Sequence, residues 1–378
     1  MAEEQEWVFT DEQQQLLDAV RKFCAEHFGE ATVRTLMESD PPFDGTVWTR
    51  LGTELGVLGL SVPEADGGVG GSLVDQAVAV EQFGATLACG PLFGTVYLAI
   101  PALVAASRGE ARDALLADLV EGTRTAAFAA DAAAVRAEGS TLSGQLGPVV
   151  DAGTADVLLV AATGADGVGL YAVEGDTDGV ERVRLVTLDL TRPQADVTLS
   201  GAAATLIAGP DEAPRVIEHA LHVGAALLAV EQVGAAAHLL DLAVEYAKSR
   251  LQFGRPIGSF QAVKHRLADM LVDAEHARST AYHAVWALAD GSDDAQLATA
   301  IAQATCSAAL SRIAADTIQV LGGIGFTWEH QAHLYFKRAV TDAALLGSAE
   351  QHRDRVAEIV LDGASADRAP KVAAGTPL

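Results

Sequence analysis

Apolar residues recur at helical spacing over the first third of the chain. Thr10 and Gln13, three residues apart, form a capping box ahead of a predicted helix over residues 14–28. A further helix is predicted over residues 73–88, and the region as a whole is an N-terminal helical domain, residues 1–122. The first helix carries its apolar residues on one face: Leu16, Leu17, Val20, Phe23 and Cys24.

The pattern changes to short β-rich runs between about Thr125 and Gly209. Each run is bounded by Gly, Asp or Thr, and none is followed by a stretch of helical spacing. This pattern is typical of an antiparallel sheet or barrel without intervening helices. It defines a central β domain, residues 123–210.

Helical spacing returns after residue 210. Asp211 is suited to cap a long helix that has Pro214 in its first turn. The expected fold class is therefore α+β and multidomain, with an N-terminal helical domain, a central antiparallel β-barrel-like domain and a C-terminal four-helix bundle. The bundle covers residues 211–362, with later helices over 260–289, 293–320 and 327–361, and residues 363–378 form a flexible tail.

Composition narrows the class of protein. The chain has 378 residues, half of them hydrophobic, and 51 acidic residues against 25 basic ones, which argues against a nucleic-acid partner. The three cysteines form no CxxC pair, so neither a disulfide framework nor a zinc site is expected. We see no signal peptide and no uncharged run long enough to span a membrane, and we expect a cytoplasmic protein.

The stretch "SRLQFGRPIGSFQAVKHRLADM", residues 249–270, interrupts a long helical pattern. Its Gly and Pro residues predict a loop between two antiparallel helices. Five cations lie within 19 residues, and either a bound phosphate or a solvated basic helix end accounts for them. These cations are Lys248, Arg250, Arg255, Lys264 and Arg266.

A glycine pair, Gly322 and Gly323, ends another predicted helix in "IQVLGGIGFTWEHQAHLYFKRA", residues 318–339. Exposed amides beside such a pair can hold a pyrophosphate, and a simple helix-ending glycine is the alternative. His330 and His333 in the same stretch could share a metal, but no third ligand is evident, so no metal site is predicted.

These two stretches resemble the C-terminal signatures of the acyl-CoA dehydrogenase family, and the domain order fits the same family. The resemblance is to its bacterial, actinobacterial-type members that form heteromeric complexes, and it implies an FAD cofactor and at least a dimer. It assigns FAD contacts to Arg250, Gln252, Phe253 and Gln261 of one subunit. A segment of the neighbouring subunit, Gln319, Val320, Leu321, Gly322 and Gly323, completes the contact.

Other parts of the family pattern are missing. Leu346 occupies the usual place of the catalytic Glu, and Gly224 occupies an alternative place for that base. Pro148–Val150 stand where a Trp-Ile-Thr segment lies against the flavin, and the loop that covers the flavin is absent. Glu231, in an apolar helix, is the remaining candidate for the base if burial raises its pKa; a paired structural carboxylate is the alternative.

The resemblance implies dehydrogenation of an acyl-CoA thioester to the 2,3-enoyl-CoA, with electrons passing to an electron-transfer flavoprotein. Three hypotheses remain open. The chain is a subunit of a heteromeric dehydrogenase whose paralogous partner supplies the base, or a homo-oligomeric enzyme with a relocated base, or a non-catalytic scaffold that binds acyl-CoA or a protein. A steroid acyl group is suggested only by the heteromeric analogy.

Overall fold

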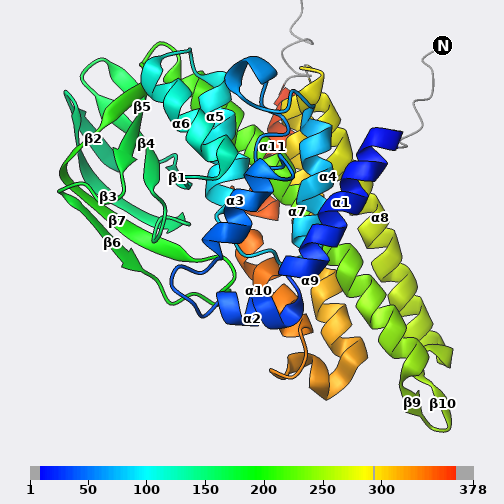
Figure 1. The fold of residues 1–378 in the computed structure, drawn as a ribbon. Coiled ribbons are helices and arrows are strands. Elements are labelled where there is room, and N and C mark those ends of the chain that lie inside the picture. Colours follow the sequence, from blue (N-terminus) through cyan, green and yellow to red (C-terminus); the bar gives the residue numbers. More distant parts are fainter. Residues whose placement is uncertain (1–8, 293, 363–378) are drawn as a thin grey trace, which may run out of the picture.

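The computed structural model describes residues 9–292 and 294–362. The predicted tail over residues 363–378 lies outside the described residues. Figure 1 shows the β sheet on one side of the molecule, the long C-terminal helices on the other, and the N-terminal helices beside and between them.

The N-terminal region is helical, as predicted. Thr10 and Gln13 form the predicted capping box, with the Gln13 backbone N–H donating to Thr10 Oγ1 at 3.2 Å and the Thr10 N–H to Gln13 Oε1 at 3.1 Å. The elements are α1 (Asp11–His27), α2 (Glu30–Leu36), α3 (Gly45–Thr53), the 3₁₀ turn η1 (Glu64–Asp66), α4 (Leu73–Thr86), the π-helix η2 (Leu92–Ala99), α5 (Ile100–Ala105) and α6 (Glu110–Glu121).

The central sheet is mixed rather than purely antiparallel. Strand β4 pairs in parallel with both β1 and β2, and the other pairings are antiparallel, in the order β6-β7-β3-β2-β4-β5-β8. The prediction missed these pairings because the runs are short and their partners are not neighbours in sequence. The strands are β1 (Ala126–Ala129), β2 (Val135–Glu138), β3 (Thr141–Val150), β4 (Val157–Gly164), β5 (Gly167–Glu174), β6 (Val180–Arg184), β7 (Gln194–Ala203) and β8 (Thr205–Ala208).

The C-terminal region contains three long helices and a divided fourth. The predicted helix over 327–361 is in fact two helices separated at residues 343–348, where Leu346 and Gly347 have positive φ and Ser348 caps the second helix. The long helix begins after Glu212 rather than with Asp211 as its cap. The elements are α7 (Ala213–Ser249), β9 (Leu251–Gln252), β10 (Arg255–Pro256), η3 (Ile257–Ser259), α8 (Gln261–Ala289), α9 (Ala295–Leu321), η4 (Gly322–Phe326), α10 (Ala332–Asp342), α11 (Ala349–Ala357) and the π-helix η5 (Glu358–Asp362).

Helix α7 crosses α4 through the centre of the molecule at two glycines. A Cβ on Gly84 would lie 2.0 Å from the Glu231 carbonyl oxygen, and one on Gly234 would lie 1.9 Å from the Glu81 carbonyl oxygen. The two backbones therefore touch, which fixes the position of Glu231 in the core. By length and composition α7 could cross a membrane, although Glu218, Glu231 and Asp241 interrupt its uncharged runs. Of its most apolar 18-residue window, 83% is buried inside the fold.

Candidate functional site

The predicted loop, residues 253–258, falls on a tight β-hairpin over residues 251–256 and the start of the 3₁₀ turn η3, at one end of the bundle. Phe253 and Gly254 form its two-residue turn with φ of +51° and +76°, the conformation of a type I′ turn. A phenylalanine in this region of φ is strained, and its side chain is 91% exposed. The chain therefore holds an aromatic ring in water at some cost in free energy.

Two of the five clustered cations remain available to a ligand. Lys248 pairs with Glu245 at 2.7 Å, Arg266 pairs with Asp316, and the Arg255 guanidinium lies 4.2 Å from the centre of the Phe260 ring. In the described part of the chain, no side-chain hydrogen bond or ion pair is made by Arg250 or Lys264, and both side chains are exposed.

The segment from Gln319 to Gly323 lies at the same end of the bundle as the hairpin (Figure 1). Gln319, Gly322 and Gly323 are exposed, whereas Val320 and Leu321 are buried and anchor the helix end. Gly322 has φ +67°, so its backbone favours glycine, but a Cβ on Gly323 would meet nothing within 4 Å. The packing of this chain does not require a glycine at 323, which leaves room for a ligand or a second chain.

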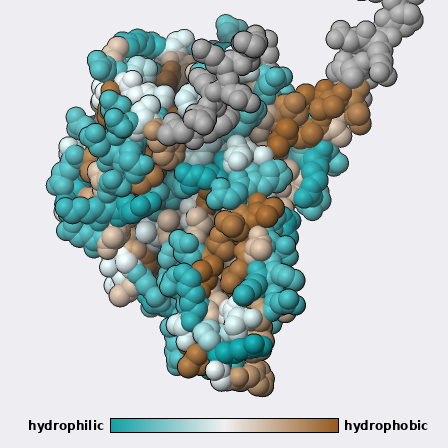
Figure 2. Space-filling model, turned by 90° about the vertical axis from the view of Figure 1, so that its right-hand side faces the viewer, coloured by the Kyte–Doolittle hydropathy of each residue, from teal (hydrophilic) through white to brown (hydrophobic). Residues whose placement is uncertain are grey.

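Large apolar side chains surround these residues at the surface. Phe326 is 70% exposed and Trp328 is 59% exposed, and the Lys337 ammonium lies 4.4 Å from a ring of Trp328. Leu251 and Ile324 are also exposed. Figure 2, which views the face that carries α1 and α8, shows further apolar residues gathered on that face. On α8, Leu271 and Val272 are exposed.

Glu231 lies far from this surface, in a buried cluster of charged side chains. Its Oε1 accepts hydrogen bonds from Arg192 and Arg338, both at 2.5 Å, and its Oε2 accepts from Arg192 at 2.7 Å and from Tyr97 Oη at 2.8 Å. Arg192 also donates to Asp342 Oδ1 at 2.8 Å. All five side chains are at most 5% exposed.

Arg338 extends the cluster to the segment between β6 and β7. Its Nε donates to Asp189 Oδ2 at 2.8 Å, and its Nη2 donates to the Thr191 hydroxyl at 2.7 Å. The guanidinium of Arg192 also lies 5.2 Å from the centre of the Phe93 ring. The cluster thus joins η2, the β domain, α7 and α10 around Glu231.

The surroundings of Glu231 correct the expected direction of its pKa. Burial alone would raise the pKa, but attraction to Arg192 and Arg338 and the hydrogen bonds from Arg192 and Tyr97 lower it below the usual value. Burial instead raises the pKa of Asp342, and Asp342 Oδ2 is buried with no hydrogen-bond partner. Within this chain, Glu231 is held as a paired carboxylate, the alternative considered from the sequence.

The two family positions for the base offer no carboxylate. Leu346 is half-buried against the core. Its backbone carbonyl oxygen accepts a hydrogen bond from His352 Nε2 at 3.0 Å. A Cβ on Gly224 would lie 2.5 Å from Leu98 Cδ2 and 3.1 Å from the Tyr97 carbonyl oxygen. A side chain at residue 224 would therefore have to displace the Leu98 side chain and would crowd the Tyr97 carbonyl oxygen.

Sequence reasoning missed the partners of Glu231. Arg192 is 39 residues away and Arg338 is 107 residues away, and no local pattern connects them. Arg338 and Asp342 are four residues apart on α10, so they lie on the same face of the helix. This spacing is a local sign that a polar face of α10 is buried.

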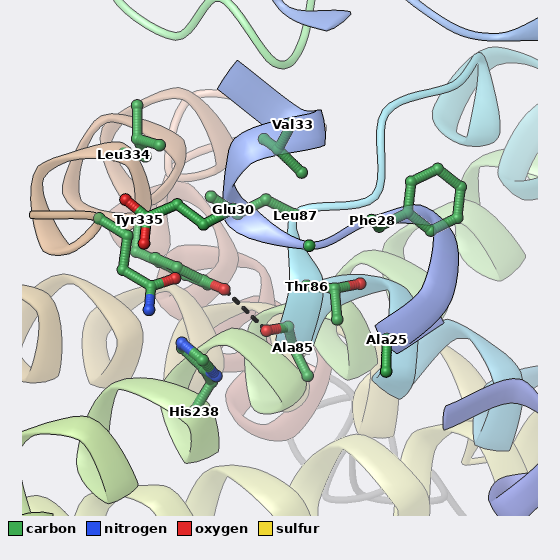
Figure 3. A pocket seen from close by; sticks show the side chains of 12 residues that line it. Ala25, Phe28, Glu30, Val33, Ala85, Thr86, Leu87, His238, Leu334 and Tyr335 are labelled. Atoms are coloured by element: carbon green, nitrogen blue, oxygen red, sulfur yellow. Dashed lines mark hydrogen bonds between the residues drawn. The ribbon is translucent and has the colours of Figure 1, made fainter. Parts of the chain in front are cut away.

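A pocket of about 190 Å³ lies where the α1–α2 turn, the end of α4, α7 and α10 meet (Figure 3). The His238 ring stacks on Tyr335 at 4.8 Å, its Nε2 is buried without a partner, and Tyr335 Oη donates to the Ala85 carbonyl at 2.7 Å. None of the predicted site residues lines this pocket. In the described residues no group of three or more His, Cys, Asp or Glu side chains could hold a metal ion.

Two family models match the chain, the N-terminal domain of acyl-CoA dehydrogenase over residues 10–123 and its C-terminal domain over residues 214–361. The chain therefore belongs to the acyl-CoA dehydrogenase family. It is 38% identical over 338 residues to acyl-CoA dehydrogenase IpdE2 of Mycobacterium tuberculosis, a match that covers 89% of this chain and 94% of that protein.

Solved structures share the fold. The ChsE4-ChsE5 complex from Mycobacterium tuberculosis matches with a TM-score of 0.87 and 28% identity, and the Tcur3481-Tcur3483 steroid ACAD with a TM-score of 0.85 and 30% identity. Each match covers 94% of this chain and 99% of the other. These comparisons confirm the predicted family and fold class, and the family is FAD-dependent.

The residues of this chain fit one half of FAD and not the other. The diphosphate and adenosine, at a subunit junction, suit the residues of the bundle end. These are the unpaired Arg250, the exposed Gln261 and Gln319, and the open space at Gly323. When bound, the flavin ring would accept a hydride. The chain has hydrophobic residues at Pro148–Val150 and Leu346, where the family has flavin-contacting and basic groups, so we derive no reaction step at a ring in this chain.

Proposed function

We propose that this chain is a non-catalytic subunit of a heteromeric acyl-CoA dehydrogenase. It contributes Arg250, Gln261 and the segment Gln319 to Gly323 to an FAD whose ring, base and acyl-CoA lie in a paralogous subunit. That complex dehydrogenates an acyl-CoA thioester at the α and β carbons and passes electrons to an electron-transfer flavoprotein.

One contrast carries the proposal. None of the three positions considered for the base offers a free one: Leu346 and Gly224 have no proton acceptor, and Glu231 is held by two guanidinium groups. The bundle end, by comparison, keeps Arg250 unpaired and Phe253 strained and exposed. A chain that served only as a scaffold would have no reason to keep these residues in this state. The ChsE4-ChsE5 complex and the Tcur3481-Tcur3483 steroid ACAD add support, because each is named for two components.

Reconstitution tests the proposal. The chain should be expressed alone and together with a paralogous acyl-CoA dehydrogenase subunit, and FAD should be measured by absorbance after gel filtration. We expect little FAD and no acyl-CoA oxidation from the chain alone, and flavin with turnover from the complex. A yellow, active homo-oligomer would contradict the proposal.

Substitutions at the bundle end then identify the half-site. Arg250→Met and Gln319→Ala in this chain should each lower FAD retention by the complex at least tenfold, because a guanidinium and an amide no longer contact the cofactor. Arg353→Met is the matched control, since its pairing with Glu350 lies on α11. An unchanged flavin spectrum in Arg250→Met would show that this arginine does not hold the cofactor.

A further inference from the structure

Three positions that the family uses for chemistry flank the buried cluster in this chain. Asp151, which directly follows the flavin-contacting positions 148–150, accepts a hydrogen bond from the Gly94 backbone N–H at 2.9 Å. Asp342 is the last residue of α10, four positions before Leu346, and the Leu98 side chain and the Tyr97 backbone carbonyl lie against Gly224. The family's positions for the flavin contact and for the base therefore lie beside the elements η2 and α10 that carry parts of the cluster.

The cluster also joins parts of the chain that are far apart in sequence, in addition to the hydrophobic core and the Thr95–Ala126 hydrogen bonds that they share. Arg192 and Asp189 belong to the β domain, Tyr97 to the N-terminal helical region, and Glu231 and Arg338 to the C-terminal helices. Each of these contacts has a sequence separation above 35 residues. Breaking the cluster would leave unpaired charges in the low-dielectric interior. Separating the three regions therefore costs much free energy.

We propose that this cluster is an interdomain lock: it closes the chain's own cleft to acyl-CoA and to the flavin ring, and it holds the three regions together without a cofactor. The proposal rests on the proposed function, since it explains why this subunit contributes only the outer half of an FAD site. It goes further in assigning the closure to five named side chains, Tyr97, Arg192, Glu231, Arg338 and Asp342.

Hydrogen exchange of the full-length chain, purified alone, tests the lock. Residues 185–195 and 337–346 should be protected without any ligand. Adding 0.1 mM FAD or 1 mM octanoyl-CoA should change their exchange rates by less than twofold, because neither probe enters the cleft. Slower exchange in either segment with octanoyl-CoA would overturn the proposal, since a ligand would then occupy the cleft.

Variants provide the second arm. Arg192→Met should raise exchange in both segments at least tenfold and leave α8 unchanged, because it frees Glu231 and Asp342 from a shared partner. If this variant does not fold, Tyr97→Phe removes a single hydrogen bond, and a threefold to tenfold rise is expected. Unchanged exchange in the folded variant would reject the lock. The proposed function is tested separately. It fails if the complex retains FAD equally well with and without the Arg250 side chain.

Discussion

Glu231 shows that the neighbours of a buried carboxylate decide its pKa more than burial does. Two guanidinium groups and a tyrosine hydroxyl surround it, so its ionised form is the stable one. A base for α-proton abstraction needs free lone pairs and a pKa near neutrality. Glu231 has neither, although its apolar sequence context suggested both.

Glu231→Gln should lower the free energy of unfolding by about 3–5 kcal/mol, because it leaves two buried arginines without their shared charge. Urea denaturation followed by circular dichroism measures the change. Glu245→Gln is the control, because its pair with Lys248 is exposed, and it should alter stability by less than about 0.5 kcal/mol. Lost turnover in a flavin-loaded complex with unchanged stability would instead make Glu231 the base.

Asp151 gives the chain a pH-dependent stability of a definite sign. Burial raises its pKa from 3.8 to about 7, only partly offset by the Gly94 N–H and the nearby arginines. Between those pH values the folded chain holds a proton that the unfolded chain has released. This carboxyl therefore opposes folding increasingly as the pH rises from about 4 to 7.

Asp151→Asn removes that titration while keeping an acceptor for the Gly94 N–H. Relative to the parent chain, the variant should gain up to about 4 kcal/mol of stability between pH 4 and pH 8. Urea midpoints measured at four pH values test this. Parallel pH profiles for the two proteins would show that Asp151 is ionised throughout.

At the scale of elements, the hairpin β9–β10 has a strained backbone that the packing of the described chain does not explain. Phe253 has a left-handed backbone and an exposed ring, which lies nearly perpendicular to the Phe260 ring at 6.1 Å between ring centres. Strain of this kind persists where a function requires it. The proposed function gives this ring a contact with a second subunit or its cofactor.

Phe253→Asn should leave the lone chain as stable or more stable by about 1 kcal/mol, because asparagine tolerates the left-handed region better. Assembly with the partner should weaken at least tenfold, measured by sedimentation. Val186→Asn is the control, since Val186 is fully exposed on the β domain. Equal assembly of both variants would remove Phe253 from the junction.

Local patterns predicted the elements well and the contacts between them poorly. The Thr10 capping box, the helix break at Gly254 and the glycine at Gly322 each depend on residues within a few positions, and all are present in the structure. The parallel pairing of β1 with β4 depends on residues that are distant in sequence. The division of the last helix has local signs, Gly347 and the Ser348 capping box, that the prediction did not use. The bundle-end residues came from family resemblance, and their binding roles stay predictions.

At the scale of the whole molecule, adding a carboxylate does not recreate an active cleft. Leu346 has φ +56° in a turn that His352 and Ser348 hold, and the buried cluster lies beyond it. Leu346→Glu in the lone chain should therefore give no octanoyl-CoA-dependent reduction of an artificial acceptor, even with added FAD. Flavin-dependent turnover by this variant would show that the cleft is open.

The contact between α4 and α7 at Gly84 and Gly234 has a consequence for how this subunit can change over evolution. Two backbones that touch leave no space for any larger residue at either glycine, so the helix that carries Glu231 cannot shift to suit a new neighbour. The arginines must then adapt to the glutamate, and substitutions among them are tolerated only in compensating sets. Descendants of this chain would thus find it hard to regain an independent catalytic centre through single mutations.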